Sequence, residues 1–194
     1  MTTSDRVLTW PTIARDVDDL VAVLNASADH QEPAHDPARA VTQLAHGLQC
    51  AALLQTTHPD DLELQVAGLL HDVGHTLAPG EVEAHGRVGC DWLAPRLGER
   101  VGALVELHVA AKRYLVTVDP TYRERLSAGS TRTLAAQGDA LSPAEIAAFR
   151  RHLHHRDALT LRRADERAKV AGIDAGRVAD WIPALRSVAS ARSR

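Results

Sequence analysis

The neighbouring pair His71-Asp72 is the most informative feature of this sequence. The pair follows the apolar stretch 64–70 and precedes Gly74 and His75. Adjacent side chains on a helix point about 100° apart, so both can face one ion only where the helix ends, and we expect Gly74 to end it. Imidazole and carboxylate groups are common ligands of transition metals, and a carboxylate can also bridge two ions. The sequence therefore predicts a metal site at the end of this helix.

Further candidate ligands are His46, His85, His108 and Asp165, each on or beside a separate predicted helix. Helical bundles assemble metal sites from side chains that point inward from several helices. Four imidazoles and two carboxylates suit iron, manganese or zinc better than magnesium. The absence of a cysteine ligand argues against a structural zinc site. Six ligands exceed what one catalytic ion can use while it keeps an open position. The set therefore predicts two metal ions bridged by Asp72.

Cationic side chains recur at helical spacing beside these ligands. Lys112 lies four residues after His108, and Arg162 lies three residues before Asp165, so each cation shares a helix face with a predicted ligand. Such cations, together with hydroxyl donors, suit a phosphonate or phosphate group. The candidate anion-binding residues are His75, Lys112, Ser130, Thr133 and Arg162, with Gln137 on the same predicted face as the two hydroxyls. Taken alone, Arg162 and Asp165 equally fit a plain ion pair, and the hydroxyls fit a polar helix edge.

The elements that position these residues are predicted to be helices throughout. Ala, Leu, Arg and Glu dominate, and apolar residues recur every three or four positions. Only 114–118 has the character of a strand, and it is too short to build a sheet. A helix start is predicted at Ser142, which precedes a proline and has a glutamate three residues later. The other expected helices cover about 12–28, 38–55, 61–73, 82–93, 98–115, 121–126 and 156–171, with a short segment from Pro183 and a frayed tail over 187–194.

Length and composition limit the class of protein. The chain has 194 residues, of which 45% are hydrophobic and 24% are charged, which is the balance of one globular domain over 1–194. A net charge of −3 gives no basic field, so neither nucleic acid nor a membrane surface is an expected partner. No apolar run reaches the roughly 18 residues of a membrane span and no secretion signal is evident, so we expect a cytoplasmic protein. Cys50 and Cys90 predict neither a disulfide framework nor a thiolate metal site.

The order of His46, His71-Asp72 and Asp165 resembles the signature of the HD-domain superfamily of helical metalloproteins. The matching motifs cover about residues 36–170, most of the chain. The resemblance implies a single HD domain, an all-α helical bundle with a central dinuclear metal site. Most members of the superfamily are phosphohydrolases, and the additional His85 and His108 are like the extra ligands of its dinuclear branches.

Four stretches narrow the resemblance to one branch. Residues 43–49, 69–75, 108–115 and 161–170 are similar to the mixed-valent di-iron oxygenases that cleave carbon–phosphorus bonds, and 108–115 is the most specific of them. The resemblance implies two iron ions, Fe(II) and Fe(III), with O2 as co-substrate. The implied reaction is oxidative cleavage of the C–P bond of a small organophosphonate, a 1-hydroxyalkylphosphonate, into phosphate and a carboxylic acid.

The resemblance also implies roles for individual residues. The implied metal ligands are His46, His71, Asp72, His85, His108 and Asp165. The implied catalytic residues are His71, Asp72, His108 and Lys112, and the implied phosphonate-binding residues are His75, Lys112, Ser130, Thr133 and Arg162. Members that act on aminoethylphosphonates carry a Tyr and a Glu where this chain has Asp36 and Arg39. Arg39 reverses the charge that a substrate ammonium group would meet, so we do not expect 2-amino-1-hydroxyethylphosphonate itself to be the substrate. We expect either that Arg39 contacts an anionic or neutral substituent of the substrate or that Asp36 contacts a cationic one.

Two other classes of function fit parts of the same pattern. A metal-dependent HD-type phosphohydrolase acting on a phosphate ester or nucleotide would use four of the ligands equally well. The stretch 108–115 and the lack of an evident base-binding signature argue against it. A non-catalytic helical binding module would require all six predicted ligands to be coincidental.

Overall fold

The structure, a computed structural model, describes residues 17–31 and 40–191. Its α-helices are α1 (Val17–Ala26), α2 (Gln43–Thr57), α3 (Leu62–Leu70), α4 (Val73–Leu77), α5 (His85–Leu97), α6 (Glu99–Val118), α7 (Ala128–Ala136), α8 (Pro143–Arg151), α9 (His155–Arg167) and α10 (Val178–Ala191). Within the described ranges there are also two short 3-10 helices, η1 (Ser27–Asp29) and η3 (Arg123–Arg125). The described residues contain no β-strand, and one isolated antiparallel bridge joins Gln31 to Thr42. The predicted all-α fold is confirmed.

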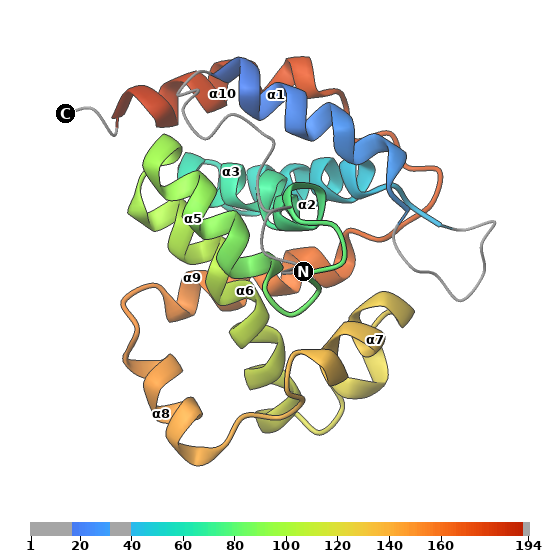
Figure 1. Ribbon diagram of the computed structural model, residues 1–194, viewed down its shortest axis with the longest axis vertical. Helices are drawn as coiled ribbons and strands as arrows, with labels where there is room; N and C mark the ends of the chain where they lie inside the picture. The colour runs from blue at the N-terminus through green and yellow to red at the C-terminus, as the bar shows by residue number, and fades with distance from the viewer. Residues whose placement is uncertain (1–16, 32–39, 192–194) are drawn as a thin grey trace, which may run out of the picture.

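Five helices in the middle of the molecule, α2, α3, α5, α6 and α9, pack on one another. α5 lies along α6, α2 lies on α3, and α9 contacts both α6 and α2. α1 and α10 lie side by side across one end of this group, while α7 and α8 lie at the opposite end (Figure 1). Leucines fill the interior, and their burial stabilises the arrangement. The fully buried ones are Leu20, Leu54, Leu64, Leu70, Leu93, Leu97, Leu104, Leu134, Leu161 and Leu185.

Hydroxyl side chains cap the starts of three helices, α2, α7 and α8. Thr42 Oγ1 accepts a hydrogen bond of 3.1 Å from the backbone N–H of Ala45 at the start of α2. Ser142 and Glu145 form a reciprocal capping box at the start of α8. Each cap satisfies an N–H group that the first turn leaves without a partner inside the helix. The helix start predicted at Ser142 is confirmed.

The helix break beside the His-Asp pair differs from the prediction. α3 ends at Leu70 and α4 begins at Val73, so Gly74 lies inside α4 and does not terminate a helix. A Cβ atom at Gly74 would lie 1.9 Å from the backbone oxygen of His85. Gly74 is therefore required by the close approach of α4 to the start of α5, and the break leaves both residues of the pair between two helices.

The C-terminal segment is more helical than predicted. α10 continues through Pro183 to Ala191, so the predicted fraying is wrong for residues 187–191, while 192–194 lie outside the described residues. Leu185 and Val188 are buried in the main core. A short amphipathic helix is marginally stable in water by itself, so the burial of these two side chains stabilises the last turns of α10.

Other predicted helix boundaries also differ from those in the structure. α2 begins at Gln43 and not near residue 38, and the start of the first predicted helix, 12–16, lies outside the described residues. The predicted helix over 121–126 contracts to η3, and 114–118 forms the last turns of α6. Among the described helices, none combines the length and the apolar character that crossing a membrane requires.

Candidate active site

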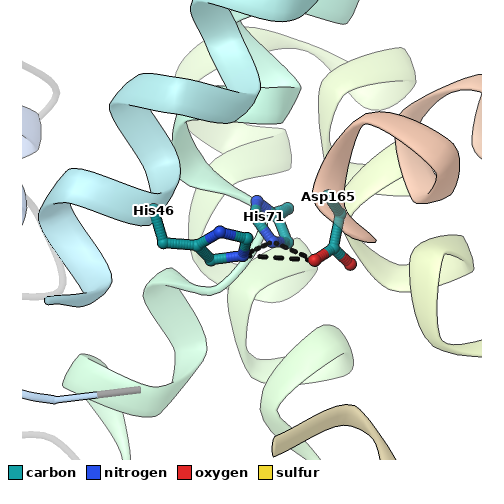
Figure 2. Close-up of side chains that lie close together, drawn as sticks. All are labelled: His46, His71 and Asp165. Carbon is teal, nitrogen blue, oxygen red and sulfur yellow. Dashed lines mark hydrogen bonds and ion pairs between the residues drawn. The ribbon is translucent and has the colours of Figure 1, made fainter. Parts of the chain in front are cut away.

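Three of the predicted ligands form a first group, His46, His71 and Asp165, in the centre of the bundle (Figure 2). His46 comes from α2, His71 follows the end of α3, and Asp165 lies in α9. His46 Nε2 is 3.1 Å from His71 Nε2 and 3.2 Å from Asp165 Oδ1, and His71 Nε2 is 3.6 Å from the same oxygen. All three side chains are buried. Their ligand atoms therefore converge on one point that is closed to bulk solvent.

The other three predicted ligands form a second group, Asp72, His85 and His108. The Nε2 atoms of His85 and His108 are 3.1 Å apart, and they lie 3.6 and 3.5 Å from Asp72 Oδ1. The second oxygen of Asp72 faces the first group, at 3.3 Å from His71 Nε2 and 3.6 Å from His46 Nε2. Asp72 thus directs one carboxylate oxygen to each group, which is the geometry of a bridging ligand.

The far ring nitrogens decide which atoms these histidines present to the centre. Each Nδ1 lies 2.5–3.1 Å from a backbone carbonyl oxygen, which can only accept a hydrogen bond, so each Nδ1–H donates. When the rings are neutral, the four Nε2 atoms carry lone pairs that face one another. Asp165 Oδ1 is also buried without a hydrogen-bond partner among the described residues. Converging lone pairs without protons are relieved by cations, so this donor set fits two metal ions.

The charges of the two groups also suit metal ions. Burial lowers the pKa of His85 and of His108 to about 4, so both rings are neutral, as a ligand must be. Burial raises the pKa of Asp165, but Arg162 and Lys169 outweigh it and hold that pKa well below its usual value. Burial by itself lowers the pKa of His71. The negative charges of Asp72 and Asp165 outweigh this effect and hold the pKa well above its usual value. A proton on His71 therefore competes with a metal ion for the same negatively charged position.

A cavity of about 350 Å³ opens beside the two groups. Its lining includes Asp72, His85, His108 and Asp165 from the predicted ligands. It also includes every candidate anion-binding residue that the structure describes: His75, Lys112, Ser130, Thr133, Gln137 and Arg162. A cavity lined by predicted metal ligands together with cationic side chains suits a small anion that contacts both. Asp36 and Arg39 lie outside the described residues.

Lys112 and His75 occupy the walls of this cavity next to the second group. Lys112 is 3% exposed, and its Nζ donates a hydrogen bond of 2.7 Å to Thr133 Oγ1. Burial and the nearby guanidinium of Arg162 lower the pKa of Lys112 to about 7. The ring of His75 stacks on that of His85, with centroids 4.1 Å apart. Both side chains are thus held beside the second group of predicted ligands.

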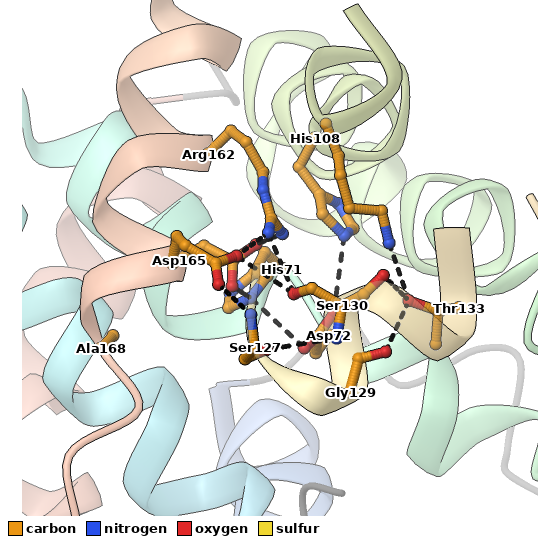
Figure 3. Close-up of polar contacts among 12 residues, drawn as sticks. His71, Asp72, His108, Ser127, Gly129, Ser130, Thr133, Arg162, Asp165 and Ala168 are labelled. Carbon is orange, nitrogen blue, oxygen red and sulfur yellow. Dashed lines mark hydrogen bonds and ion pairs between the residues drawn. The ribbon is translucent and has the colours of Figure 1, made fainter. Parts of the chain in front are cut away.

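Arg162 links the first group of predicted ligands to α7 (Figure 3). Its guanidinium donates to Asp165, and also to Ser130 Oγ at 3.0 Å. It further donates to the Tyr122 hydroxyl at 2.8 Å and to Glu166. The ion pair between Arg162 and Asp165, which their spacing allowed, is therefore present, and Arg162 also lines the cavity.

Sequence reasoning missed Glu166 and Tyr122, the two other partners of Arg162. Glu166 accepts hydrogen bonds from the backbone N–H of Ser127 at 2.6 Å and from Ser130 Oγ at 3.1 Å, so it ties the start of α7 to α9. The spacing of four residues from Arg162 was a signal for Glu166. Tyr122 lies next to η3, in the stretch 121–126 that was predicted to be a helix, and its separation of 40 residues from Arg162 left no local signal for the contact.

Comparisons with known proteins agree with this geometry. A model of the HD domain family matches residues 37–171. The chain is 41% identical over 154 residues to a hydroxymethylphosphonate dioxygenase of Gimesia maris, and the match covers 75% of this chain and 75% of that protein. It is 31% identical over 142 residues to a glycine-betaine-forming 1-hydroxy-2-(trimethylamino)ethylphosphonate dioxygenase of Leisingera caerulea, over 69% of this chain and 72% of the relative.

The helical bundle, the paired His/Asp groups and the family match together define a metal-binding HD-domain protein. The chain belongs to the HD-domain family and, within it, to the oxygenase branch that contains these phosphonate dioxygenases, as its motifs predicted. It is therefore an enzyme of the oxygenase class.

Proposed function

We propose that this enzyme uses O2 to cleave the C–P bond of a small 1-hydroxyalkylphosphonate. One observation carries the proposal: two three-residue ligand groups share Asp72 and face a cavity whose other charged residues are cations. The names of the two relatives support the same class of substrate. The proposed products are phosphate and the carboxylic acid that retains the carbon chain.

We assign the metal pair to iron, in the Fe(II)/Fe(III) state. The first ion is held by His46, His71 and Asp165, the second by His85 and His108, and Asp72 bridges both. When bound, the pair supplies Lewis acidity for the substrate hydroxyl and the redox chemistry for O2. With Asp72 counted at both ions, the first ion would have four protein ligands and the second three, which leaves positions for the substrate and for O2.

The protein side chains bind and orient the phosphonate group. Lys112 and Arg162 supply positive charge from opposite helices, α6 and α9, and His75 supplies a ring nitrogen from α4. Ser130 and Thr133 place their hydroxyls on the same wall from α7. Fixing the phosphonate in this way directs the hydrogen on C1 toward the metal pair and lowers the entropic part of the barrier.

The proposed reaction is balanced by one molecule of O2. The C1–H bond and the C–P bond break, one oxygen atom is added to C1 and the other to phosphorus, and O2 is the oxidant. His71, Asp72, His108 and Lys112 are the residues to which we assign the catalytic roles, because they hold the metal pair or contact the charge on the substrate.

The charges around the cavity favour a substrate without a cationic substituent. In the part of the chain that the structure describes, the carboxylates that line the cavity are Asp72 and Asp165, and both are assigned to metal ions. An ammonium group on the substrate therefore has no free carboxylate among these residues, which agrees with the charge reversal at Arg39. Hydroxymethylphosphonate is accordingly the first substrate to test.

The decisive test measures phosphate release from hydroxymethylphosphonate by the iron-loaded enzyme in air and under strict exclusion of O2. We expect release in air, with formate as the second product, and none without O2. Equal release in both conditions would eliminate the oxidative mechanism. Turnover of phosphate esters with Mn²⁺, independent of O2, would instead establish the phosphohydrolase alternative. An EPR signal of a coupled Fe(II)/Fe(III) pair that changes on addition of the phosphonate would verify the metal assignment.

A further inference from the structure

Gln49 is a buried polar residue of α2 that the proposed mechanism does not use. Its side chain is 5% exposed and lies one helical turn after His46. The Gln49 amide donates to the Val170 carbonyl at 2.9 Å and accepts from the Val170 N–H at 3.1 Å. One side chain thus satisfies both backbone groups of a residue that follows α9 and has no helical partner there.

The segment that Gln49 holds also orients a metal ligand. The carbonyl of Ala168, two residues before Val170, accepts the Nδ1–H of His46 at 3.1 Å. Ala168 is the C-cap of α9, the helix that carries Asp165. His46 and Gln49 face the same side of α2 and make parallel links to this segment. These links set the separation of His46 and Asp165, two ligands of the same group.

His46 differs in this respect from the other three histidine ligands. The Nδ1 atoms of those three bond to carbonyls only three residues earlier, those of Gly68, Val82 and Val105. Their orientation is therefore local to one turn of chain. The partner of His46 lies 122 residues away in the sequence, so it depends on the tertiary position of the segment after α9.

We propose that Gln49 is a positioning residue of the metal centre, which sets the orientation of His46 through the Ala168 carbonyl and thereby tunes the first metal group alone. The proposal rests on the metal pair of the proposed function. Loss of such an outer hydrogen bond typically weakens metal binding by about 10–100-fold. We expect a loss of this size at the first group and none at the second, whose histidines are oriented locally.

The test titrates the metal-free protein with Mn²⁺ and follows free Mn²⁺ by EPR, which gives an affinity for each site without any turnover. Asp165→Asn and His85→Ala assign the two affinities to the two groups. The test variant is Gln49→Met, which keeps the volume and removes both bonds. The matched control is Gln65→Met, because Gln65 is 2% exposed and its amide likewise donates to two backbone carbonyls, those of His58 at 2.8 Å and Pro59 at 3.0 Å, away from the metal ligands.

The expected result is weaker Mn²⁺ binding at the first group in Gln49→Met, with both affinities unchanged in Gln65→Met. Gln49→Asn, which keeps the amide but is one methylene too short for both bonds, should give the same site-specific loss if Gln49→Met folds poorly. Unchanged affinity in both Gln49 variants, or the same loss in Gln65→Met, would overturn the proposal. Such a result leaves the oxygenase assignment intact, whereas a wild-type protein that binds no Mn²⁺ would refute the metal centre itself.

Discussion

Replacing Lys112 by Met should weaken phosphonate binding and leave both metal ions in place. Lys112 lines the cavity but is not among the six ligands, and its nearest polar contact is Thr133 Oγ1 at 2.7 Å. Met has a similar length and no charge, so the substitution removes the ammonium group and keeps most of the packing. The change should therefore appear in KM much more than in metal content.

The magnitude follows from the burial of the side chain. A hydrogen bond between charged partners contributes about 1.5–3 kcal/mol, which corresponds to roughly 10- to 150-fold in affinity. Lys112 is only 3% exposed, so solvent screens its charge weakly and the upper half of this range is expected. Thr133 offers no charge that replaces the ammonium group.

The pH dependence provides a second signature of the same residue. The pKa of Lys112 is lowered to about 7, so the free enzyme carries the charge below pH 7 and loses it as the pH rises through this value. A bound anion favours the protonated amine, and wild-type affinity should therefore decline above pH 7. Dividing the KM of the wild type by that of Lys112→Met at each pH removes the contribution of phosphonate ionisation.

The assay measures kcat, KM and iron content for hydroxymethylphosphonate between pH 6 and 9. The control is Arg113→Met, which removes a cation at the next position of α6 whose partners are the Asp139 carbonyl and Glu145, on the outer side of the helix. Arg113→Met should leave KM unchanged. An unchanged KM in Lys112→Met, a KM ratio that does not vary with pH, or a loss of iron would refute the reasoning.

Three further predictions concern the metal centre and the fold. His108→Ala should lower the metal content measured by mass spectrometry, because it removes a ligand of the second group, and two fully bound ions would contradict that role. Gly74→Ala should lower the thermal midpoint, since overpacking typically costs about 1–3 kcal/mol and the new Cβ would lie 1.9 Å from the His85 oxygen; an unchanged midpoint would show that α4 can shift freely. Arg100→Met should lower the free energy of unfolding by about 1–2 kcal/mol at neutral pH, because Arg100 pairs with three carboxylates. Arg100 lowers the pKa of Asp61 below 3.8, so this difference should be complete above pH 4 and vanish as the pH falls through the folded-state pKa, as urea titrations at several pH values would reveal.

The positions of the site residues were predictable because helical periodicity is a local property. The spacing of apolar residues placed His46, His108 and Asp165 on separate helices, and the pair His71-Asp72 had to lie at a helix end to face one centre. The spacing of Lys112 from His108 placed both on one face of α6. All of these arrangements are present in the structure.

The details that depend on contacts between distant segments were not predictable. Gly74 looked like a helix terminator, since the sequence holds no information about how closely α4 approaches α5. The fraying predicted from residue 187 failed because Leu185 and Val188 are buried against the rest of the core. Tyr122 became visible as a partner of Arg162 only when η3 was brought to α9, whereas Glu166 lies one turn after Arg162 in α9 itself.

The sequence by itself determined the all-helical class, the six candidate ligands and the cationic character of the pocket, because residue type and helical spacing are enough for each. The tertiary structure alone decided that these ligands divide into two groups of three, with one oxygen of Asp72 directed to each. It also decided that the lone pairs of four histidines face inward, because each Nδ1–H donates to a backbone carbonyl. Distances of about 3 Å between side chains from five different segments follow from helix packing, which cannot be inferred from any single stretch of the sequence.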